Sequence, residues 1–342
     1  MKRQAVYFVG PHQAEVRDES VSAEPGAGQV MIESVLSAIS PGTEMLIYRG
    51  QAPVELAADE SISSLSGTLS FPIKYGYCVV GRVIRIGSGV PERLVNTLVF
   101  AFNPHETHFV ANWSEVILLP DAVSPEDALF LPNMETAVNL VMDARPMIGE
   151  RGVVFGQGIV GLLTAALLAQ HPLNQLIAVD RYPNRREASK QMGVSMCLDP
   201  ADPAFLNQLR EQLGSDGADL CIEVSGAPEA LDQAIHVAGY SGRVIIGSWY
   251  GVKQTSLDLG GSFHRSRVKL ISSQVSSISP ELTGRWTKQR RFEVAWDAIR
   301  RLRPSRLITH RIPFGRAVEA YDLCDKHPGD SIQIILDYGS ST

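Results

Sequence analysis

The residues with the most specific spacing form a glycine-rich turn in the middle of the chain. Gly156, Gly158 and Gly161 follow the apolar run 151–155 and open the helix-forming run 162–169. A strand, a G-x-G-x-x-G motif and a helix in this order are typical of a dinucleotide site. The first glycine would permit the tight turn, the second would let a pyrophosphate approach the backbone, and the third would let helix and strand pack closely.

The start of that helix and the end of the next apolar run complete the predicted cofactor site. Ile159 and Val160 lie at the helix start, where free backbone N–H groups would face the phosphates. Asp180 ends the next run, and a carboxylate there accepts hydrogen bonds from the ribose hydroxyls of NAD and repels the 2′-phosphate of NADP. Arg181 and Arg185 follow, and arginines at this place can bind that phosphate instead. The sequence therefore favours NAD and keeps NADP as the alternative.

The elements that must position this site alternate between short apolar runs and helical segments. After residue 151 the apolar runs are 153–155, 176–179, 220–224 and 243–247, with helical segments between them. This alternation predicts a parallel sheet with helices on both faces, and ligands bind beyond the carboxyl ends of such strands. Four residues that follow the later runs are therefore expected to face the cofactor: Ser225, Gly226, Gly247 and Ser248.

Composition and the remaining segments narrow the class of protein. The chain has 342 residues and a net charge of −6, which argues against a general nucleic-acid binder, because such proteins need a basic face. Its most apolar stretch, 159–168, is too short to cross a membrane. Its four cysteines form no C-x-x-C pair, which argues against disulfides and fits a cytoplasmic protein. The first 120 residues are rich in strand-like runs separated by Gly and Pro.

An ordered series of motifs resembles the medium-chain dehydrogenase/reductase superfamily over essentially the whole chain. Around the glycine-rich unit, the series consists of the segments 41–44 (PGTE), 71–83, 308–314 and 331–336. The resemblance implies an α/β protein in which a Rossmann domain is inserted into a GroES-like, β-rich catalytic domain, with the active site in the cleft between them. We expect the catalytic domain at 1–133 with 280–342 and the Rossmann domain at 134–279. The resemblance also implies a homodimer, and it places Ser273 near the nicotinamide amide.

Three positions of this chain depart from the zinc-using relatives. Those relatives have Cys-Gly-Thr/Ser-Asp where this chain has PGTE, and Gly-His-Glu where it has Gly76-Tyr77-Cys78. Their third ligand aligns best with Asn133. A catalytic zinc needs three ligands of the Cys, His or carboxylate type, whereas Pro41 has no ligand atom and Tyr and Asn are poor ligands. The lobe that carries four cysteines in many relatives is also absent. We therefore expect neither zinc site.

Without a metal, side chains must stabilise the oxygen that becomes negative during hydride transfer. Thr43 matches the family's proton-relay hydroxyl. Tyr77 could donate the proton, or it could merely fill the space that the metal leaves. Glu135 could orient the substrate or Tyr77, or it could be an acid favoured by a helix N-terminus. His105 and His108 could bind a metal or line the substrate pocket, or form a solvent-facing or locally satisfied pair. The arginine-rich stretch 285–306 is best interpreted as a solvated helix face.

The leading hypothesis is a zinc-independent NAD-dependent oxidoreductase that acts on a small-molecule secondary alcohol or ketone. An NAD(P)H-dependent reductase of enones or quinones is the first alternative, and Asp180 argues against it because those relatives usually lack an acid at this position. A cofactor-binding protein without catalysis is the second alternative. Neither nucleic acid nor a membrane is expected as a partner.

Overall fold

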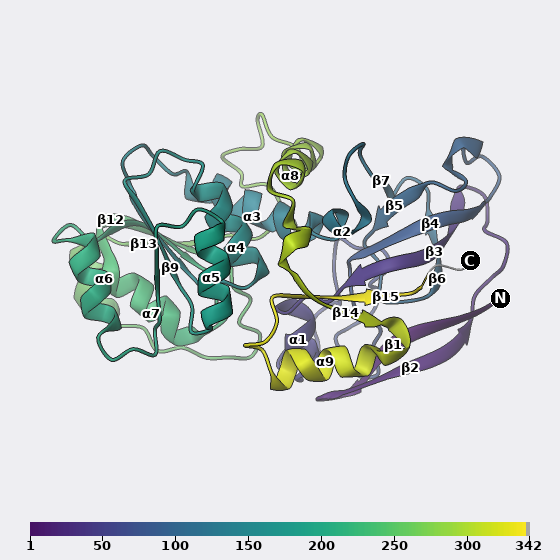
Figure 1. The fold of residues 1–342 in the computed structure, drawn as a ribbon, viewed down its shortest axis with the longest axis horizontal. Coiled ribbons are helices and arrows are strands. Elements are labelled where there is room, and N and C mark those ends of the chain that lie inside the picture. The colour runs from purple at the N-terminus through teal and green to yellow at the C-terminus, as the bar shows by residue number, and fades with distance from the viewer. Residues whose placement is uncertain (340–342) are drawn as a thin grey trace. The chain divides into compact units, whose positions relative to one another are not determined.

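The computed structural model describes residues 1–339 and divides the chain into two compact units (Figure 1). The first unit comprises Met1–Phe130 and the segment from Arg303 onward, and the second comprises Leu131–Leu302. We expected the chain to return to its first domain at residue 280, but the second unit continues to Leu302 because α8 packs on α3. Within the described residues, no helix is long and apolar enough to cross a membrane.

The first unit is built on strands from both parts of the chain, which pair antiparallel except for β14 and β15, which are parallel. A hairpin, β1 and β2, stands apart from a larger sheet with the order β14-β15-β3-β4-β5-β7, to which β6 adds by pairing with β3. The strands are β1 (Lys2–Gly10), β2 (Gln13–Ser20), β3 (Gln29–Ala38), β4 (Val79–Ile86), β5 (Leu98–Ala101), β6 (His108–Asn112), β7 (Ile117–Leu118), β14 (Ile308–Pro313) and β15 (Gln333–Asp337). Because β15 pairs with β3, residues from near both ends of the chain share one sheet.

Short helices close the core of this unit. They are α1 (Thr43–Tyr48), η1 (Glu92–Leu94), α2 (Pro125–Ala128), η3 (Pro304–Leu307), η4 (Phe314–Arg316) and α9 (Ala317–Lys326). The aromatic rings of Phe8, Tyr48 and Tyr321 pack together between the hairpin, α1 and α9, with centroids 4.9–5.6 Å apart. This packing fixes α1, whose first residue is Thr43, against the buried side of the unit.

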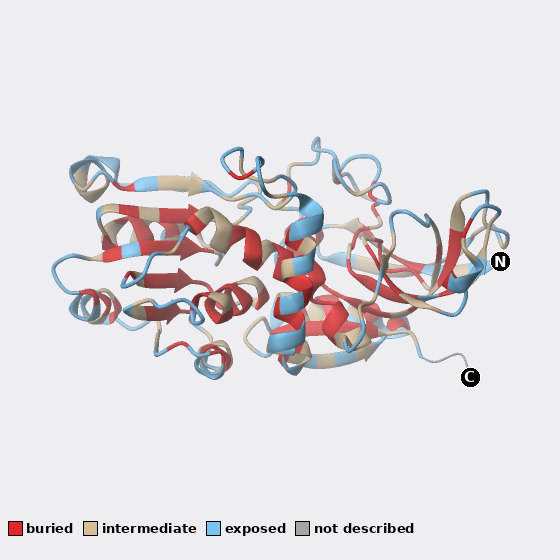
Figure 2. Cartoon of the chain, turned by 90° about the horizontal axis from the view of Figure 1, so that it is seen from above, coloured by how far each residue is buried: buried red, intermediate tan, exposed pale blue. Residues whose placement is uncertain are grey.

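The second unit contains a six-stranded parallel sheet in the order β10-β9-β8-β11-β12-β13. Its strands are β8 (Arg151–Phe155), β9 (Gln175–Val179), β10 (Met196–Leu198), β11 (Ala218–Glu223), β12 (Ala238–Ile246) and β13 (Lys269–Ser272). Alternate residues of one strand face different cores: Val153 and Phe155 pack on one side, and Val154 packs on the other. This burial on both faces explains why strands such as β8 and β9 are apolar after their first residue (Figure 2).

Helices cover both faces of that sheet, as the sequence predicted. The helices are α3 (Leu131–Ala144), α4 (Ile159–Leu168), α5 (Pro183–Gln191), α6 (Phe205–Leu213), α7 (Pro228–Val237), the single π-helical turn η2 (Leu259–Phe263) and α8 (Lys288–Leu302). Apolar residues of α3 and α4 pack on one face, and those of α6 and α7 pack on the other. The predicted α/β class and doubly covered parallel sheet are therefore confirmed.

Candidate coenzyme site and hydroxyl cluster

The glycine-rich turn connects β8 to α4, and two of its glycines have no room for a side chain. Gly156 has a φ of +91°, and a Cβ there would lie 2.5 Å from the Cα of Ser225. A Cβ on Gly161 would lie 1.9 Å from the carbonyl oxygen of Gly156. Gly158 caps α4 without a side-chain hydrogen bond, and the backbone N–H groups of Ile159 and Val160 follow it. Those N–H groups have no acceptor within the helix, so the turn fits a phosphate group.

Asp180 lies directly after β9 and is fixed beside this turn. The carboxylate is 8% exposed, and its Oδ2 accepts a 2.7 Å hydrogen bond from the backbone N–H of Gln157. Its Oδ1 accepts a second hydrogen bond, of 2.8 Å, from the N–H of Tyr182. A carboxylate has about four acceptor positions, so two such bonds orient it and leave capacity for ribose hydroxyls. The arrangement fits the sequence prediction for this residue.

The two arginines after Asp180 surround one aromatic ring. The guanidinium carbons of Arg181 and Arg185 each lie 4.8 Å from the centre of the Tyr182 ring. Arg185 also reaches the glycine turn, since its Nη1 would lie 3.9 Å from a Cβ on Gly158. Positive charge therefore lies close to the turn, as a 2′-phosphate or a pyrophosphate would need.

The loops after β11 and β12 are held to one another at the same end of the sheet. The N–H of Gly226 donates to the Ser248 hydroxyl at 2.9 Å. A Cβ on Gly247 would lie 2.6 Å from a methyl group of Leu140, so the loop runs close against α3. Ser225 donates its backbone N–H to Glu223 at 2.7 Å. The structure thus brings together the four loop residues that the sequence assigned to the cofactor.

Glu223 was not identified from the sequence, and its carboxylate accepts hydrogen bonds from residues of both loops. Its carboxylate is fully buried at the end of β11 and also accepts a hydrogen bond from the Tyr250 hydroxyl. Burial raises the pKa of Tyr250, and the neighbouring carboxylate adds to that effect. The phenol therefore stays neutral and donates. The sequence did contain a signal for this role. Glu223 is the single acidic residue in the apolar run 220–224, and a buried carboxylate needs hydrogen-bond partners.

Ser273 is tied to α3 rather than left open. Its hydroxyl donates to Asp143 at 2.7 Å and accepts from the Asn139 amide at 3.0 Å. Its backbone N–H donates to the carbonyl of Ile246 at 2.9 Å. A role of Ser273 beside the nicotinamide stays a prediction.

In the first unit, Thr43 and Tyr77 come together. Thr43 begins α1, Tyr77 lies just before β4, and both side chains are partly exposed. The Tyr77 hydroxyl donates to the Ser40 hydroxyl at 2.6 Å, and the Thr43 side chain lies close enough to Tyr77 to act on the pKa of its phenol, which it lowers. Burial raises the pKa of Tyr77 above its ordinary value, so the phenol keeps its proton. Three hydroxyls therefore meet at one place: those of Ser40, Thr43 and Tyr77.

A buried acid and a buried histidine lie behind these hydroxyls. The Glu44 Oε1 accepts a 2.8 Å hydrogen bond from the N–H of Ser40. Its Oε2 lies 3.0 Å from the His105 Nε2 and accepts a 2.8 Å hydrogen bond from the Tyr321 hydroxyl. The other ring nitrogen of His105 lies 2.7 Å from the Ser37 hydroxyl. Both Glu44 and His105 are completely buried.

The two histidines of the 103–108 segment do not act as a pair. His108 begins β6, is partly exposed, and lies 3.7 Å from Glu33. Burial lowers the pKa of His108, and the nearby Glu33 partly opposes that effect. The idea of a solvent-facing or locally satisfied pair was wrong for His105, because its partners are 61 and 68 positions away in the sequence.

Glu135 lies in α3 and is committed to an arginine. Its Oε1 accepts from both Nε and Nη2 of Arg291, at 3.1 and 2.7 Å. The same guanidinium donates to Asn139 and to the backbone carbonyls of Val275 and Ser277, so all five of its N–H groups have acceptors. Burial raises the pKa of Glu135, and Arg291 opposes that effect.

This pair also corrects our interpretation of the basic stretch. Arg291 is completely buried in α8, although we expected it on a solvated helix face. The reason is that Glu135 and the carbonyls lie on the apolar side of α8 and replace water for the guanidinium. The catalytic role of Glu135 stays a prediction. Its carboxylate is bonded to Arg291 in the structure.

The residues at the family's zinc positions do not form a ligand set. Pro41 offers no ligand atom, Tyr77 bonds to Ser40, and Asn133 is an amide. Within residues 1–339, no group of three or more His, Cys, Asp or Glu side chains is close enough together to hold a metal ion. Zinc independence stays a prediction.

Two comparisons by sequence point to the same superfamily. The family model for zinc-binding dehydrogenases matches residues 160–289. The D-guloside 3-dehydrogenase of Escherichia coli K12 is 25% identical over 323 residues, which cover 90% of this chain and 92% of that protein. The (R,R)-butanediol dehydrogenase of Bacillus subtilis is 25% identical over 266 residues, which cover 69% of this chain and 75% of that one.

Solved structures show the same fold. An alcohol dehydrogenase from Escherichia coli CFT073 in complex with NADH has a TM-score of 0.79 at 18% identity, covering 98% of this chain and 99% of that one. A zinc-binding dehydrogenase from Sinorhizobium meliloti bound to NADP has a TM-score of 0.77 at 17% identity, with the same coverage. Together with the glycine turn and the paired sheets, these similarities identify the chain. It belongs to the medium-chain dehydrogenase/reductase superfamily of oxidoreductases, on the side of the alcohol and threonine dehydrogenases.

Proposed function

We propose that this protein is a zinc-independent, NAD-dependent dehydrogenase that transfers hydride between nicotinamide and a secondary alcohol or ketone. The observation that carries the proposal is the Thr43–Tyr77 hydroxyl pair, which lies on the two segments where zinc-using relatives carry ligands. Hydroxyl donors can stabilise the developing negative charge on a carbonyl oxygen, which zinc otherwise does.

The coenzyme preference rests on Asp180. Its carboxylate is oriented by two backbone N–H groups beside the glycine turn, and it would accept hydrogen bonds from the ribose hydroxyls. The coenzyme, when bound, supplies or accepts the hydride. Arg185 beside Gly158 keeps NADP as the alternative, and one similar structure is bound to NADP.

The substrate class rests on the relatives and on the hydroxyl pair together. Several similar proteins are dehydrogenases of hydroxyl compounds, namely D-guloside, (R,R)-butanediol and L-threonine. Alcohol oxidation and ketone reduction both need a group that exchanges a proton with the reacting oxygen. Tyr77 meets this need as a donor, because its raised pKa keeps the phenol protonated at neutral pH.

Three residues of the first unit would have separate roles in the reaction. In ketone reduction, the Thr43 hydroxyl would donate a hydrogen bond to the substrate oxygen, and the Tyr77 phenol would give it the proton. The phenolate that remains would take a proton from water, because the Tyr77 side chain is partly exposed. Ser40 can hydrogen-bond to Tyr77 in both states, since a hydroxyl both donates and accepts. In alcohol oxidation the same groups would act in reverse.

Zinc independence is supported by the chemistry of the side chains at the expected ligand positions. Pro41 cannot bind a metal at all, and Tyr77 and Asn133 are poor zinc ligands. The proposed reaction therefore has no step on a metal ion.

The test is NADH oxidation by the purified protein with two panels of substrates. One panel contains ketones and aldehydes, and the other contains enones and quinones. Turnover on the carbonyl panel supports the proposal. Turnover on the second panel alone would replace the proposal with an alkene or quinone reductase, and NADH binding without any turnover would leave a cofactor-binding protein.

A further inference from the structure

His105 is a completely buried, titratable side chain to which the proposed reaction gives no task. It makes contacts with two segments that the proposed chemistry needs. Through Glu44 it reaches the turn that begins α1, and the ring itself lies against the segment that carries Tyr77.

The contact with α1 runs through the Glu44 carboxylate. Glu44 directly follows Thr43, and its Oε1 holds the backbone N–H of Ser40 at 2.8 Å. The same carboxylate thus closes the turn between the two hydroxyl residues. Its Oε2 is held by His105 Nε2 at 3.0 Å and by the Tyr321 hydroxyl at 2.8 Å. Because a carboxylate only accepts hydrogen bonds, removal of the ring leaves Oε2 with one donor in a buried site.

The contact with the Tyr77 segment is steric. Gly76 has a φ of +132°, and a Cβ on it would lie 2.7 Å from the imidazole ring of His105. The ring therefore packs directly on the backbone that precedes Tyr77. Only glycine leaves this space and adopts this backbone conformation without strain.

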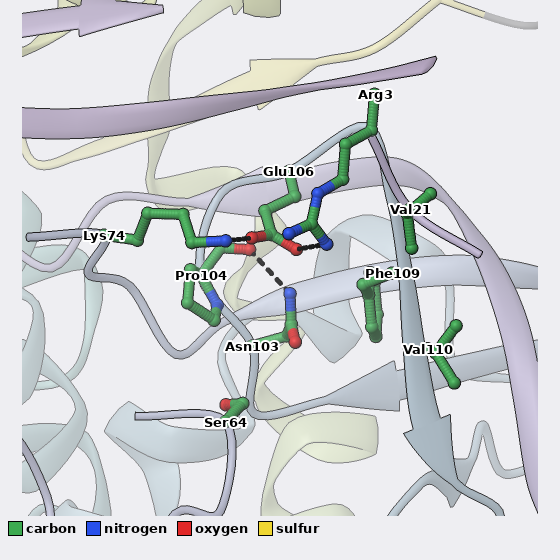
Figure 3. A pocket seen from close by; sticks show the side chains of 9 residues that line it. All are labelled: Arg3, Val21, Ser64, Lys74, Asn103, Pro104, Glu106, Phe109 and Val110. Atoms are coloured by element: carbon green, nitrogen blue, oxygen red, sulfur yellow. Dashed lines mark hydrogen bonds and ion pairs between the residues drawn. The ribbon is translucent and has the colours of Figure 1, made fainter. Parts of the chain in front are cut away.

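The loop that carries His105 is also held by hydrogen bonds and ion pairs with other segments of the first unit. The carbonyl of His105 accepts from the N–H of Val6 at 3.0 Å. The next residue, Glu106, is ion-paired with Arg3 at 3.0 Å and with Lys74, and Figure 3 shows both cations pointing at this carboxylate. The ring is thus held in place before any substrate binds.

We propose that His105 is a positioning residue, which fixes the Thr43 and Tyr77 hydroxyls through its contacts with Glu44 and Gly76. This inference rests on the proposed function, because it assigns His105 to the same hydroxyl pair. The ring touches neither hydroxyl, so it acts through its neighbours. A misplacement of about 1 Å in a catalytic group can lower turnover by about 100-fold.

Two amide variants test the contributions of the two ring nitrogens of His105 separately. In His105→Gln the amide nitrogen can take the place of Nε2 and keep the donor to Glu44. In His105→Asn the amide reaches only the place of Nδ1, near Ser37, so Glu44 loses a donor. We expect kcat to fall by tenfold or more in His105→Asn and to recover mostly in His105→Gln, while the NADH Kd stays unchanged in both.

A matched control uses the other histidine of the same segment. His108→Asn makes the same chemical change three positions later, at a partly exposed side chain without a contact to Glu44. It should keep the kcat of the unchanged protein. All values of kcat are corrected for the folded fraction, so a merely structural role of His105 would leave them unaltered.

Amide hydrogen exchange gives a readout that does not depend on turnover. The N–H of Ser40 should exchange faster in His105→Asn than in His105→Gln, because its acceptor Glu44 is then less well held. Equal kcat in both variants, or equal Ser40 exchange, would overturn the positioning role. Failure of the proposed function would look different, since the unchanged protein would then lack carbonyl turnover while the exchange difference persisted.

Discussion

In the proposed reaction, the proton transfer to the substrate depends on Tyr77. Burial raises the pKa of its phenol above the ordinary value, so this group remains protonated up to a pH above about 10. We expect Tyr77→Phe to lower kcat by about 100-fold, the lower end of the range for general acid–base catalysis. The kcat of ketone reduction should not fall between pH 7 and 10 through ionisation of Tyr77.

The check is kcat as a function of pH for the unchanged protein and for Tyr77→Phe. A loss of activity with a midpoint well below pH 10 that disappears in Tyr77→Phe would show an easily ionised phenol, and this contradicts the raised pKa. A kcat unchanged by the substitution would make Tyr77 a filler of the space that zinc occupies in relatives.

In the proposed reaction, Thr43 would provide a hydrogen bond to the substrate oxygen. Removal of one such donor from an enzyme costs about 100- to 1,000-fold in kcat, and a partly exposed site can lose less. We expect Thr43→Ala to lower kcat by roughly tenfold to a thousandfold, whereas Thr43→Ser keeps the hydroxyl and most of the activity. The NADH Kd, measured by fluorescence, should be the same for both. If Thr43→Ala turns over as fast as Thr43→Ser, Thr43 has no part in the mechanism.

The two hydroxyl residues could be predicted from sequence because each lies in a short motif. The support behind them could not. Glu44 and His105 are 61 positions apart, and Tyr321 is 277 positions from Glu44. No local spacing indicates that such residues meet, because only the paired strands and the contact between α1 and α9 bring them together. Ser40 could not be predicted either, because only the structure shows that its hydroxyl accepts a hydrogen bond from Tyr77.

At the scale of elements, the unit from β8 to α5 carries the residues that were predicted for the coenzyme site. Asp180→Asn keeps the size of this side chain but removes the charge, and its amide nitrogen cannot accept one of the two backbone N–H bonds that the carboxylate accepts. A hydrogen bond to a charged group is worth about 1.5–3 kcal/mol, so the ratio of NADPH to NADH affinity should rise by about tenfold to 100-fold. The two Kd values, measured by fluorescence titration, test this; an unchanged ratio would contradict the role of Asp180 in coenzyme choice.

The contact between α3 and α8 depends on the ion pair of Glu135 and Arg291. Arg291→Met leaves the buried Glu135 carboxylate without its counter-charge, which should lower the free energy of unfolding by about 3–5 kcal/mol at pH 7. Without Arg291 the folded-state pKa of Glu135 rises further above its ordinary range. A carboxyl with a raised folded-state pKa favours folding when protonated, so the loss should shrink as the pH falls toward 4.5.

Urea unfolding of the unchanged protein and of Arg291→Met at pH 7 and pH 5 measures this difference. Glu135→Gln combined with Arg291→Met should be more stable than Arg291→Met alone, because no buried charge remains. A loss that is equal at both pH values would mean that the Glu135 carboxylate does not carry the effect.

The parallel sheet and its glycine turn could be predicted because the required signals are local. The apolar runs and G-x-G-x-x-G spacing identify β8, α4 and β9 directly. For helix α8, local sequence signals were not sufficient to predict which side chains are buried. Its many arginines indicate a solvated face, and only the distant acceptors on α3 and on the 275–277 segment explain why Arg291 is buried.

At the scale of the whole molecule, the sequence indicated two domains and the superfamily, but it placed one boundary 23 residues too early. The return to the first unit follows α8, since this helix packs on α3 of the second unit. The homodimer and the cytoplasmic location stay predictions.

Turnover by the metal-free protein tests the account most directly. The protein is treated with a chelator, its metal content is measured, and NADH oxidation is followed with the best substrate of the carbonyl panel. We predict that kcat is the same before and after treatment and that added Zn²⁺ does not raise it. Loss of ketone reduction on chelation, with recovery on addition of Zn²⁺, would contradict a mechanism that relies on the hydroxyls of Thr43 and Tyr77.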